Sequence, residues 1–516
     1  MPNEPVLIFR CKFSNLKIAL EAALLVRELT KFWLKSLQSY VIIQQKQEAK
    51  MRVISLVFLP VVMGGGAPSS ESWLGASPVP LIVPEWTQTT IAPMLSSLTF
   101  ADLNSDGVKE VIATTYGKDP NPYSSGWVYV WDIQGANLPG WPIQTTSGPI
   151  PSTPAIGDID GDGDQELVVG NWSQLFVWNH DGTAYPGWPR PYGGYNSVAL
   201  EDLDEDGDRE IVYPSGSLLY VFQHDGTSIP GFPVSVSHDD VGPPSVADID
   251  GDSLLEVVAG ITRGPVIPGP FEVYAWEADG SVIAGFPVQT CGIVKGTPAL
   301  GDLEGDGTVE ITVGAYHSSN SDSLYVWDSH GNLKPGWPIQ VSYCRLSPPA
   351  LGDLGHDGVL EIVLGGMNAM YAFHYDGTPV QNWPVSFAAG GNVNSSPVVA
   401  DIDGDSIQIE VLVKVANNIY AFHSDGSQVA GYPYFLDDQS HTGTTSPSPA
   451  VGDLDSDGDV ELAFGSCYGE VHFFDEPQAY FESCEHWPMY KHDQWNTGFY
   501  PRKGAPGIEE TSNDQL

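Results

Sequence analysis

The residues best able to do chemistry are acids that recur in a nine-residue pattern, Asp-x-Asp-x-Asp-Gly-x-x-Glu. One copy is complete, with Asp158, Asp160, Asp162 and Glu166. Such a loop curls so that alternate side chains converge, and Gly163 lets the backbone turn sharply. The carbonyl oxygen of the seventh residue would add a ligand. Because oxygen donors at this density suit Ca²⁺, which takes six to eight of them, the pattern predicts structural calcium sites.

The pattern occurs eight times, and the copies are not equal. Two more keep all four acids, namely Asp202, Asp204, Asp206 and Glu210, and Asp453, Asp455, Asp457 and Glu461. Two have one altered ligand, namely Asp102, Asn104, Asp106 and Glu110, and Asp302, Glu304, Asp306 and Glu310. Two lack the loop glycine, namely Asp248, Asp250, Asp252 and Glu256, and Asp401, Asp403 and Asp405, where Glu410 comes one residue late. The last has Gly355 as its middle residue, between Asp353, Asp357 and Glu361. We expect six competent sites, a compromised one at Asp401, and a weak or empty one at Asp353.

An alternative interpretation is a set of acidic hairpin turns, since Asp and Gly favour turns without any metal. Packing four carboxylates together without a counter-ion is unfavourable, however, and several copies would have to do so independently. The charge distribution also favours cation binding. Residues 1–52 hold 9 of the 21 Lys and Arg and 4 of the 65 Asp and Glu, which leaves 12 basic against 61 acidic residues, a net charge of −49. A body this acidic repels nucleic acid and anionic membrane surfaces.

Short strands must hold these loops. The first Asp of successive copies recurs every 44 to 56 residues, between two apolar segments of strand length. An alternating aromatic segment follows, as in 128–131 and 175–178, and then a polar turn such as 180–182. Four strand-sized pieces and a period near 50 predict an all-β propeller of four-stranded antiparallel blades. One aromatic per unit is expected to pack between blades rather than form a ligand platform: Trp141, Trp188, Phe232, Phe286, Trp337, Trp383 and Tyr432.

Eight loops predict eight blades, with a seven-bladed ring and one displaced unit as the alternative. The segment Glu85-Trp86-Thr87 resembles the end of a unit and could pair with the last blade to close the ring.

The repeats resemble FG-GAP/VCBS repeats, the calcium-loop blades also found in the heads of integrin α-subunits. The resemblance covers residues 95–500, because loop, flanking strands and period agree there. The ending Trp487 to Tyr500 is similar to the closing segment of secreted bacterial propellers of this type. The resemblance implies a calcium-binding propeller that acts in adhesion.

The N-terminus differs from this body. Residues 1–50 contain no glycine, and Lys17 to Lys50 has the composition of a helix. Met51-Arg52, an apolar run and small residues at 64–67 are typical of a secretory signal peptide, which predicts a secreted or cell-surface protein. We therefore expect residues 1–50 to lie outside the mature protein, with a signal peptide at 51–67, a latch segment at 68–94 and a disordered tail at 501–516. The alternative is a genuine N-terminal helix with a buried apolar patch.

Four cysteines follow the predicted signal peptide, and two pairings are plausible, Cys291 with Cys344 and Cys467 with Cys484. The sequence lacks a Gly-x-Ser-x-Gly elbow, an HExxH motif and a phosphate loop. Histidines in repeated turns, such as His180 and His224, suggest scaffold rather than a general base. Cations available to a lyase are few: Arg263, Lys295, Arg345 and Lys414.

Three functions therefore stay open. The first is a monomeric module that binds a protein or glycan and is not an enzyme. The second is a polysaccharide lyase of rhamnogalacturonan type, a family with similar calcium-loop blades. The third is a structural component of the cell surface. Residues that break the repeat, the loop at Arg263 and Ser440-His441-Thr442, are candidates for shaping a binding face.

Overall fold

The computed structural model describes residues 9–12, 39–47, 52–60, 83–117, 124–236, 240–262, 271–317, 322–341, 343–344, 347–387, 390–436, 447–481, 484–494 and 496–500. The chain divides into two units, Met1–Pro78 and Val79–Leu516. Across the described residues, no helix has the length and apolar character needed to cross a membrane.

The first unit contains a small antiparallel sheet of order β1-β3-β2, formed by β1 (Phe9–Lys12), β2 (Ser39–Gln47) and β3 (Arg52–Pro60). The helix suggested by composition is therefore wrong for Ser39–Gln47. This segment carries Val41, Ile42 and Ile43, which favour strands, and pairs along its whole length with β3. The proposed leader overlaps β3 and extends beyond the described residues, so its removal stays a prediction.

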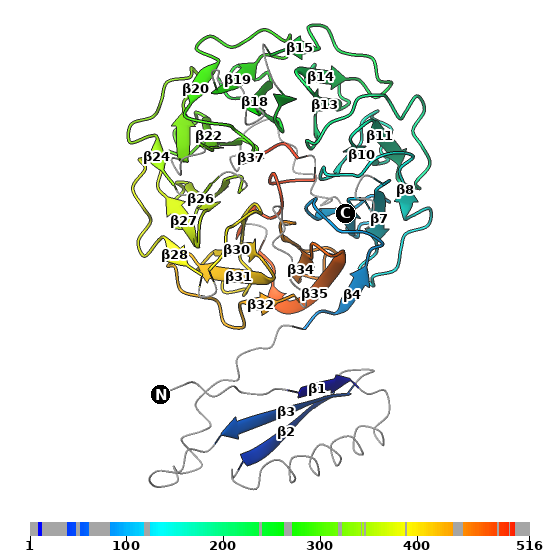
Figure 1. The fold of residues 1–516 in the computed structure, drawn as a ribbon, viewed down its shortest axis with the longest axis vertical. Helices are drawn as coiled ribbons and strands as arrows, with labels where there is room; N and C mark the ends of the chain where they lie inside the picture. Colours follow the sequence, from blue (N-terminus) through cyan, green and yellow to red (C-terminus); the bar gives the residue numbers. More distant parts are fainter. Residues whose placement is uncertain are drawn as a thin grey trace, which may run out of the picture. The chain divides into compact units, whose positions relative to one another are not determined.

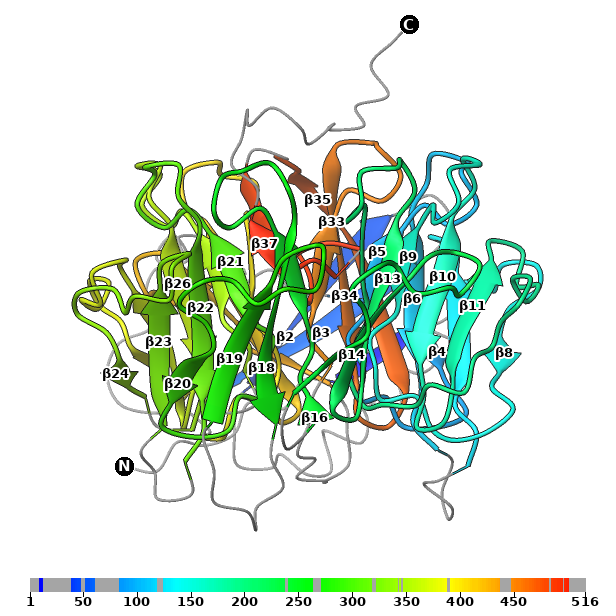
Figure 2. The same ribbon diagram turned by 90° about the horizontal axis from the view of Figure 1, so that it is seen from above.

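The second unit is a propeller of eight blades, as the eight loops predict (Figures 1 and 2). In chain order the first four are β5 (Thr99–Ala101), β6 (Glu110–Thr114), β7 (Trp127–Trp131) and β8 (Ile143–Gln144); β9 (Ala155–Gly157), β10 (Glu166–Gly170) and β11 (Leu175–Asn179); β12 (Ala199–Glu201), β13 (Glu210–Ser215), β14 (Leu218–Phe222) and β15 (Val234–Ser235); and β17 (Ser245–Ala247), β18 (Glu256–Thr262), β19 (Phe271–Trp276) and β20 (Val288–Thr290), with β16 (Asp240–Val241) added.

The fifth to seventh blades are β21 (Ala299–Gly301), β22 (Glu310–Ala315), β23 (Ser323–Trp327) and β24 (Ile339–Gln340); β25 (Ala350–Gly352), β26 (Glu361–Gly365), β27 (Ala369–Phe373) and β28 (Val385–Ser386); and β29 (Val398–Ala400), β30 (Glu410–Val415), β31 (Asn418–His423) and β32 (Tyr434–Phe435). The eighth contains β33 (Ala450–Gly452), β34 (Asp459–Gly465) and β35 (Glu470–Ala479). Neighbouring strands within every blade are antiparallel. Because side chains alternate along a strand, successive residues of each central strand face first one neighbouring blade and then the other.

An N-terminal strand closes the ring. β4 (Trp86–Thr89) pairs antiparallel with β35 and becomes the fourth strand of the last blade, as the segment Glu85-Trp86-Thr87 predicts. Trp86 stacks on Phe473 with ring centroids 4.9 Å apart, and its indole N–H donates to the carbonyl of Ile133 in the first blade. One side chain therefore joins the first and last blades.

The centre of the ring is occupied by the segment from Cys484 to Tyr500 (Figure 1). Its strand β36 (Glu485–Trp487) pairs with β29, and β37 (Phe499–Tyr500) runs parallel to β21. Between them, backbone carbonyls accept N–H groups from the inner strands of other blades, including Ile156 to Gln494, Val246 to Thr497 and Val451 to Pro488.

The core lies between adjacent blades, and the aromatic before each repeated proline belongs to it. Trp141, Trp188, Trp337 and Trp383 are buried. Each indole N–H donates to a backbone carbonyl in the turn of the next blade, at 2.8–3.2 Å. The prediction that these aromatics pack between blades is confirmed.

Candidate metal loops

Each acidic loop joins the first strand of a blade to the second. The loop that begins at Asp158, for example, runs from the end of β9 to the start of β10. The first strand is short and apolar, so the Asp that follows it is where the chain leaves the core. Since every blade has the same antiparallel connection, all eight loops lie on one face of the ring.

Hydrogen bonds from the backbone shape each loop around its own carboxylates. In the first blade Asp102 accepts the N–H groups of Asp106 at 3.1 Å and Gly107 at 2.9 Å, and Asp106 accepts that of Val108 at 2.9 Å. The loop at Asp353, which lacks the middle acid, keeps the equivalent bonds to its first Asp. The backbone of the loop is therefore preserved even where a side-chain ligand has been lost.

The two loops without glycine also keep this geometry. Ser253 and Ser406 take the glycine position with φ of 76° and 52°, in the left-handed region. Both donate their N–H to the first Asp of the loop, Ser253 to Asp248 at 3.0 Å and Ser406 to Asp401 at 2.8 Å. Losing the glycine therefore strains the loop without opening it.

The eight closing glutamates share one buried environment. All eight are buried, with 0–2% of each residue exposed. In each of them Oε2 accepts a hydrogen bond from the N–H of the residue that follows the first Asp, at 2.6–3.2 Å: Glu110, Glu166, Glu210, Glu256, Glu310, Glu361, Glu410 and Glu461. The pKa of Glu166 and of Glu256 is raised to about 8, chiefly by burial and also by neighbouring acids, which together outweigh the lowering effect of this hydrogen bond.

The residues present fit a divalent cation. The second oxygen, Oε1, of Glu210 and of Glu256 is buried and has no hydrogen-bond partner among the described residues. The carboxylates around it converge: one oxygen each from Asp248, Asp250 and Glu256 lie within 4.8 Å of one another, and the same holds for Asp158, Asp160 and Glu166. A buried carboxylate without a partner is costly, and a cation beside it would offset that cost.

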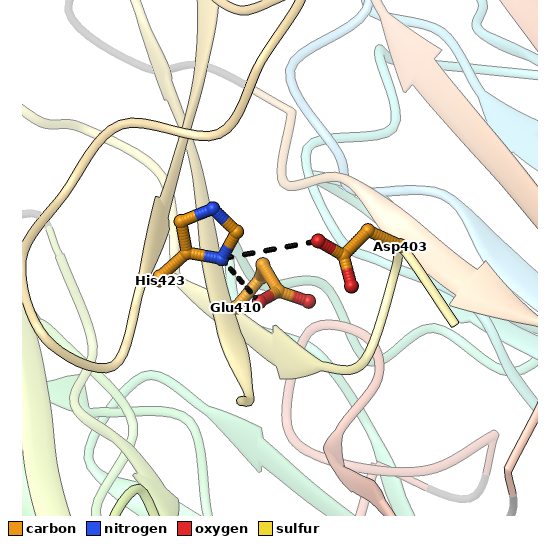
Figure 3. Close-up of side chains that lie close together, drawn as sticks. All are labelled: Asp403, Glu410 and His423. Atoms are coloured by element: carbon orange, nitrogen blue, oxygen red, sulfur yellow. Dashed lines mark hydrogen bonds and ion pairs between the residues drawn. The ribbon is translucent and has the colours of Figure 1, made fainter. Parts of the chain in front are cut away.

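Three consecutive blades place a basic side chain against the closing glutamate instead. In the fifth blade Lys334 lies 3.1 Å from Glu310. In the sixth blade His374 Nδ1 is 3.0 Å from Glu361 Oε1. In the seventh blade His423 Nδ1 is 2.8 Å from Glu410 Oε1 and 4.0 Å from Asp403 (Figure 3).

The sequence pattern did not predict these contacts. The glutamates begin the second strand of these blades, whereas the basic residues lie at or after the end of the third strand. His374 and His423 lie directly after the aromatic of the third strand, and the same position elsewhere holds Gln223, Glu277 and Asp475. Gln223 Nε2 donates to Asp204 at 2.8 Å. Burial, followed by the loop aspartates, raises the pKa of both Glu277 and Asp475, so these two acids lie close enough to feel the charge of their loops. One sequence signal could have indicated these contacts, because all of these residues directly follow the last aromatic of the third strand.

The residues singled out for other roles are only partly described. The loops at Arg263 and His441, and Arg345, lie outside the described residues. Lys414 is fully buried and donates to Cys467 Sγ at 3.5 Å, which withdraws it from any surface that a polysaccharide could reach. Among the described residues no disulfide joins Cys291 to Cys344 or Cys467 to Cys484, so neither plausible pairing is formed here.

The fold and these loops define the class: an eight-bladed propeller with acidic, metal-type loops on one face. More particularly, residues 102–169, which hold the loops at Asp102 and Asp158, match the model of the FG-GAP-like repeat family, so this part of the propeller is similar to FG-GAP-like repeats. No curated protein matches the sequence significantly.

Solved structures are similar to this chain in general architecture. The biofilm matrix protein Bap1 of V. cholerae has 14% identity, covers 82% of this chain and 96% of its own, and gives a TM-score of 0.46. The Dos1 propeller has 9% identity, with 78% and 96% covered and a TM-score of 0.47. The C-terminal domain of Pseudomonas aeruginosa PilY1 has 12% identity, with 71% and 93% covered and a TM-score of 0.39. Nothing about ligands follows from likenesses of this size.

Proposed function

We propose that this protein is an extracellular binding module whose propeller is stabilised by calcium in the blade loops. One observation carries the calcium assignment. The closing glutamates of the third and fourth blades present a buried oxygen without a partner to a group of converging aspartates. When bound, Ca²⁺ would offset part of the negative charge of these carboxylates.

The donor chemistry supports calcium over other metals. In the second blade Asp158, Asp160, Asp162 and Glu166 would hold the ion, all through oxygen. Hard oxygen ligands without sulfur or nitrogen favour Ca²⁺ over Zn²⁺ and copper. The chain positions these groups in advance, because Asp158 is already fixed by the N–H groups of Gly161 and Gly163 at 2.8 and 2.9 Å.

The acidic body and the signal-like segment at 51–67 support an extracellular setting. Calcium modules that work there have dissociation constants of roughly 10⁻⁴–10⁻³ M. The net charge of −44 disfavours nucleic acid as a partner and leaves a protein or a glycan as the ligand class.

The histidines of the repeated turns support a scaffold role: His224 lies 2.8 Å from Asp208, and His180 lies 3.5 Å from Asp164, each beside its own blade's loop. We propose a monomer that is not an enzyme.

Equilibrium dialysis against calcium, followed by metal analysis, tests the metal assignment. We expect several bound ions per chain, and none bound at millimolar calcium would overturn it. The variant Glu210→Gln should lose one ion, whereas Glu272→Gln, on a strand away from the loops, should lose none.

The binding role needs a separate experiment. A glycan array with the calcium-loaded protein should show retention of a defined class of glycan, or a pull-down with candidate surface proteins should show a saturable partner. An absorbance assay for unsaturated products on pectic polysaccharides provides the counter-test. Product formation would replace the binding module with a lyase.

A further inference from the structure

Lys334 occupies a position that is apolar in most other blades. Its backbone N–H donates to the carbonyl of Val326, and the same bond is made by Leu138, Ile229, Ile283 and Val429 in their own blades. Those four side chains are buried aliphatic groups that pack under the loop. Lysine at this position therefore departs from the repeat, and packing does not explain it.

The ammonium group of Lys334 enters the acidic loop of its blade. Its Nζ lies 2.6 Å from Glu304 Oε1 and 3.1 Å from Glu310 Oε1. Two carboxylates at hydrogen-bond distance favour the charged form of this ammonium group. Only 17% of the lysine side chain is exposed, and none of Glu310.

A second departure from the repeat occurs in the same loop and contacts the first. The third position of this loop is Glu304, where six of the other loops have Asp or Asn and the loop at Asp353 has Gly. The longer side chain makes the 2.6 Å contact with Lys334. Two unusual residues in one blade that bind each other indicate a joint substitution rather than two separate losses.

The atom that Lys334 contacts is the one that is unpartnered elsewhere. Glu310 Oε1 accepts from the ammonium, whereas Oε1 of Glu210 and of Glu256 has no partner among the described residues. We propose that Lys334 is the resident cation of the loop Asp302–Glu310, and that this loop takes no calcium. A divalent ion at the same carboxylates would meet a positive charge at hydrogen-bond distance from its ligands.

This inference rests on the proposed calcium binding of the other loops, and a reciprocal exchange tests it. Lys334→Ile combined with Glu304→Asp rebuilds the pattern of the third blade. Ile229→Lys combined with Asp204→Glu transfers the pair to the loop at Asp202. By equilibrium dialysis, the first variant should bind one calcium ion more than the wild type, and the second should bind one fewer. Unchanged stoichiometry in both would overturn the inference.

Thermal unfolding in EDTA distinguishes failure of this inference from failure of the calcium assignment. Lys334→Ile should lower the Tm in EDTA, because Glu310 loses its counter-ion, and added calcium should restore the loss. An unchanged Tm in EDTA would refute the role of Lys334 as a resident cation. A wild type that binds no calcium would instead refute the proposed function, while the Tm change in EDTA would still report on the lysine.

Discussion

The loops of the third and fifth blades have the same backbone but neutralise their buried glutamate differently. Glu210 Oε2 accepts the loop N–H groups of Leu203 at 2.8 Å and Asp204 at 3.3 Å, and Glu310 Oε2 accepts that of Leu303 at 3.0 Å. The other oxygen differs: Glu210 Oε1 has no partner among the described residues, while Glu310 Oε1 is bound by Lys334. The repeat therefore preserves the shape of the loop, whereas the cation beside its buried glutamate changes from blade to blade.

Removing calcium should have the largest effect. At calcium ten times the dissociation constant each filled site adds about 1.4 kcal/mol, so loss of several sites removes a large part of the roughly 5–15 kcal/mol of a typical fold. We expect excess EDTA to lower the Tm by many degrees in differential scanning calorimetry. Sodium chloride at equal ionic strength should not replace calcium. An unchanged Tm in EDTA would contradict the proposed difference between loops that bind calcium and the loop that Lys334 neutralises.

The two glutamates should respond oppositely to the loss of their charge. Glu310→Gln leaves Lys334 with only Glu304 and should destabilise the fold by about 1–3 kcal/mol with or without calcium. Glu210→Gln removes a buried charge that has no cation in EDTA, so it should not destabilise there, but it should lose about 1.4 kcal/mol of calcium stabilisation. Urea unfolding of both variants in EDTA and in calcium measures this. Equal losses in EDTA would contradict the comparison.

The dependence of stability on pH should differ between the two states. Burial raises the pKa of Glu110 to about 7 and of Glu210 and Glu461 to about 8, above the ordinary 4.5. Without calcium the folded protein therefore binds more protons than the unfolded chain, and stability should fall as pH rises from about 4.5 towards 8. Calcium displaces those protons, so its stabilisation should grow over the same window.

Tm measurements at pH 5 and pH 7.5, each in EDTA and in calcium, test this dependence. Acids with a lowered pKa, such as Asp181 and Asp225, act only below this window. A calcium-free protein that is more stable at pH 7.5 than at pH 5 would refute the assignment.

The smallest effect is expected at the serine that replaces the loop glycine. Ser253→Gly should stabilise the protein by about 0.5–1 kcal/mol, because φ of 76° is strained for serine and free for glycine. Gly163→Ser in the second blade, where φ is 94°, is the matched reverse change and should destabilise by a similar amount. Chemical denaturation in saturating calcium compares the two. A gain of stability from Gly163→Ser would show that the loops differ in more than their charges.

Much of the fold could be predicted from local pattern. The spacing of Asp158 and its counterparts predicts the length of the repeat, and the alternating apolar segments predict the strands of each blade. Both signals depend on residues that are close in sequence. The partners of the closing glutamates could not be predicted, since Lys334 reaches Glu310 across 24 positions and through a different strand. Ser39–Gln47 was mistaken for helix because composition ignores the pairing partner, which is β3.

The central segment has a consequence for when the ring can form. Asn496 donates to the carbonyl of Pro154, 342 positions earlier, and Lys491 donates to that of Pro244, 247 positions earlier, at 2.6 Å. Contacts this distant in sequence are slow to form, because a long loop must close before they contribute. The inner strands of several blades therefore keep unsatisfied N–H groups until residues 484–500 have been synthesised. The ring can therefore be completed only once this segment is available.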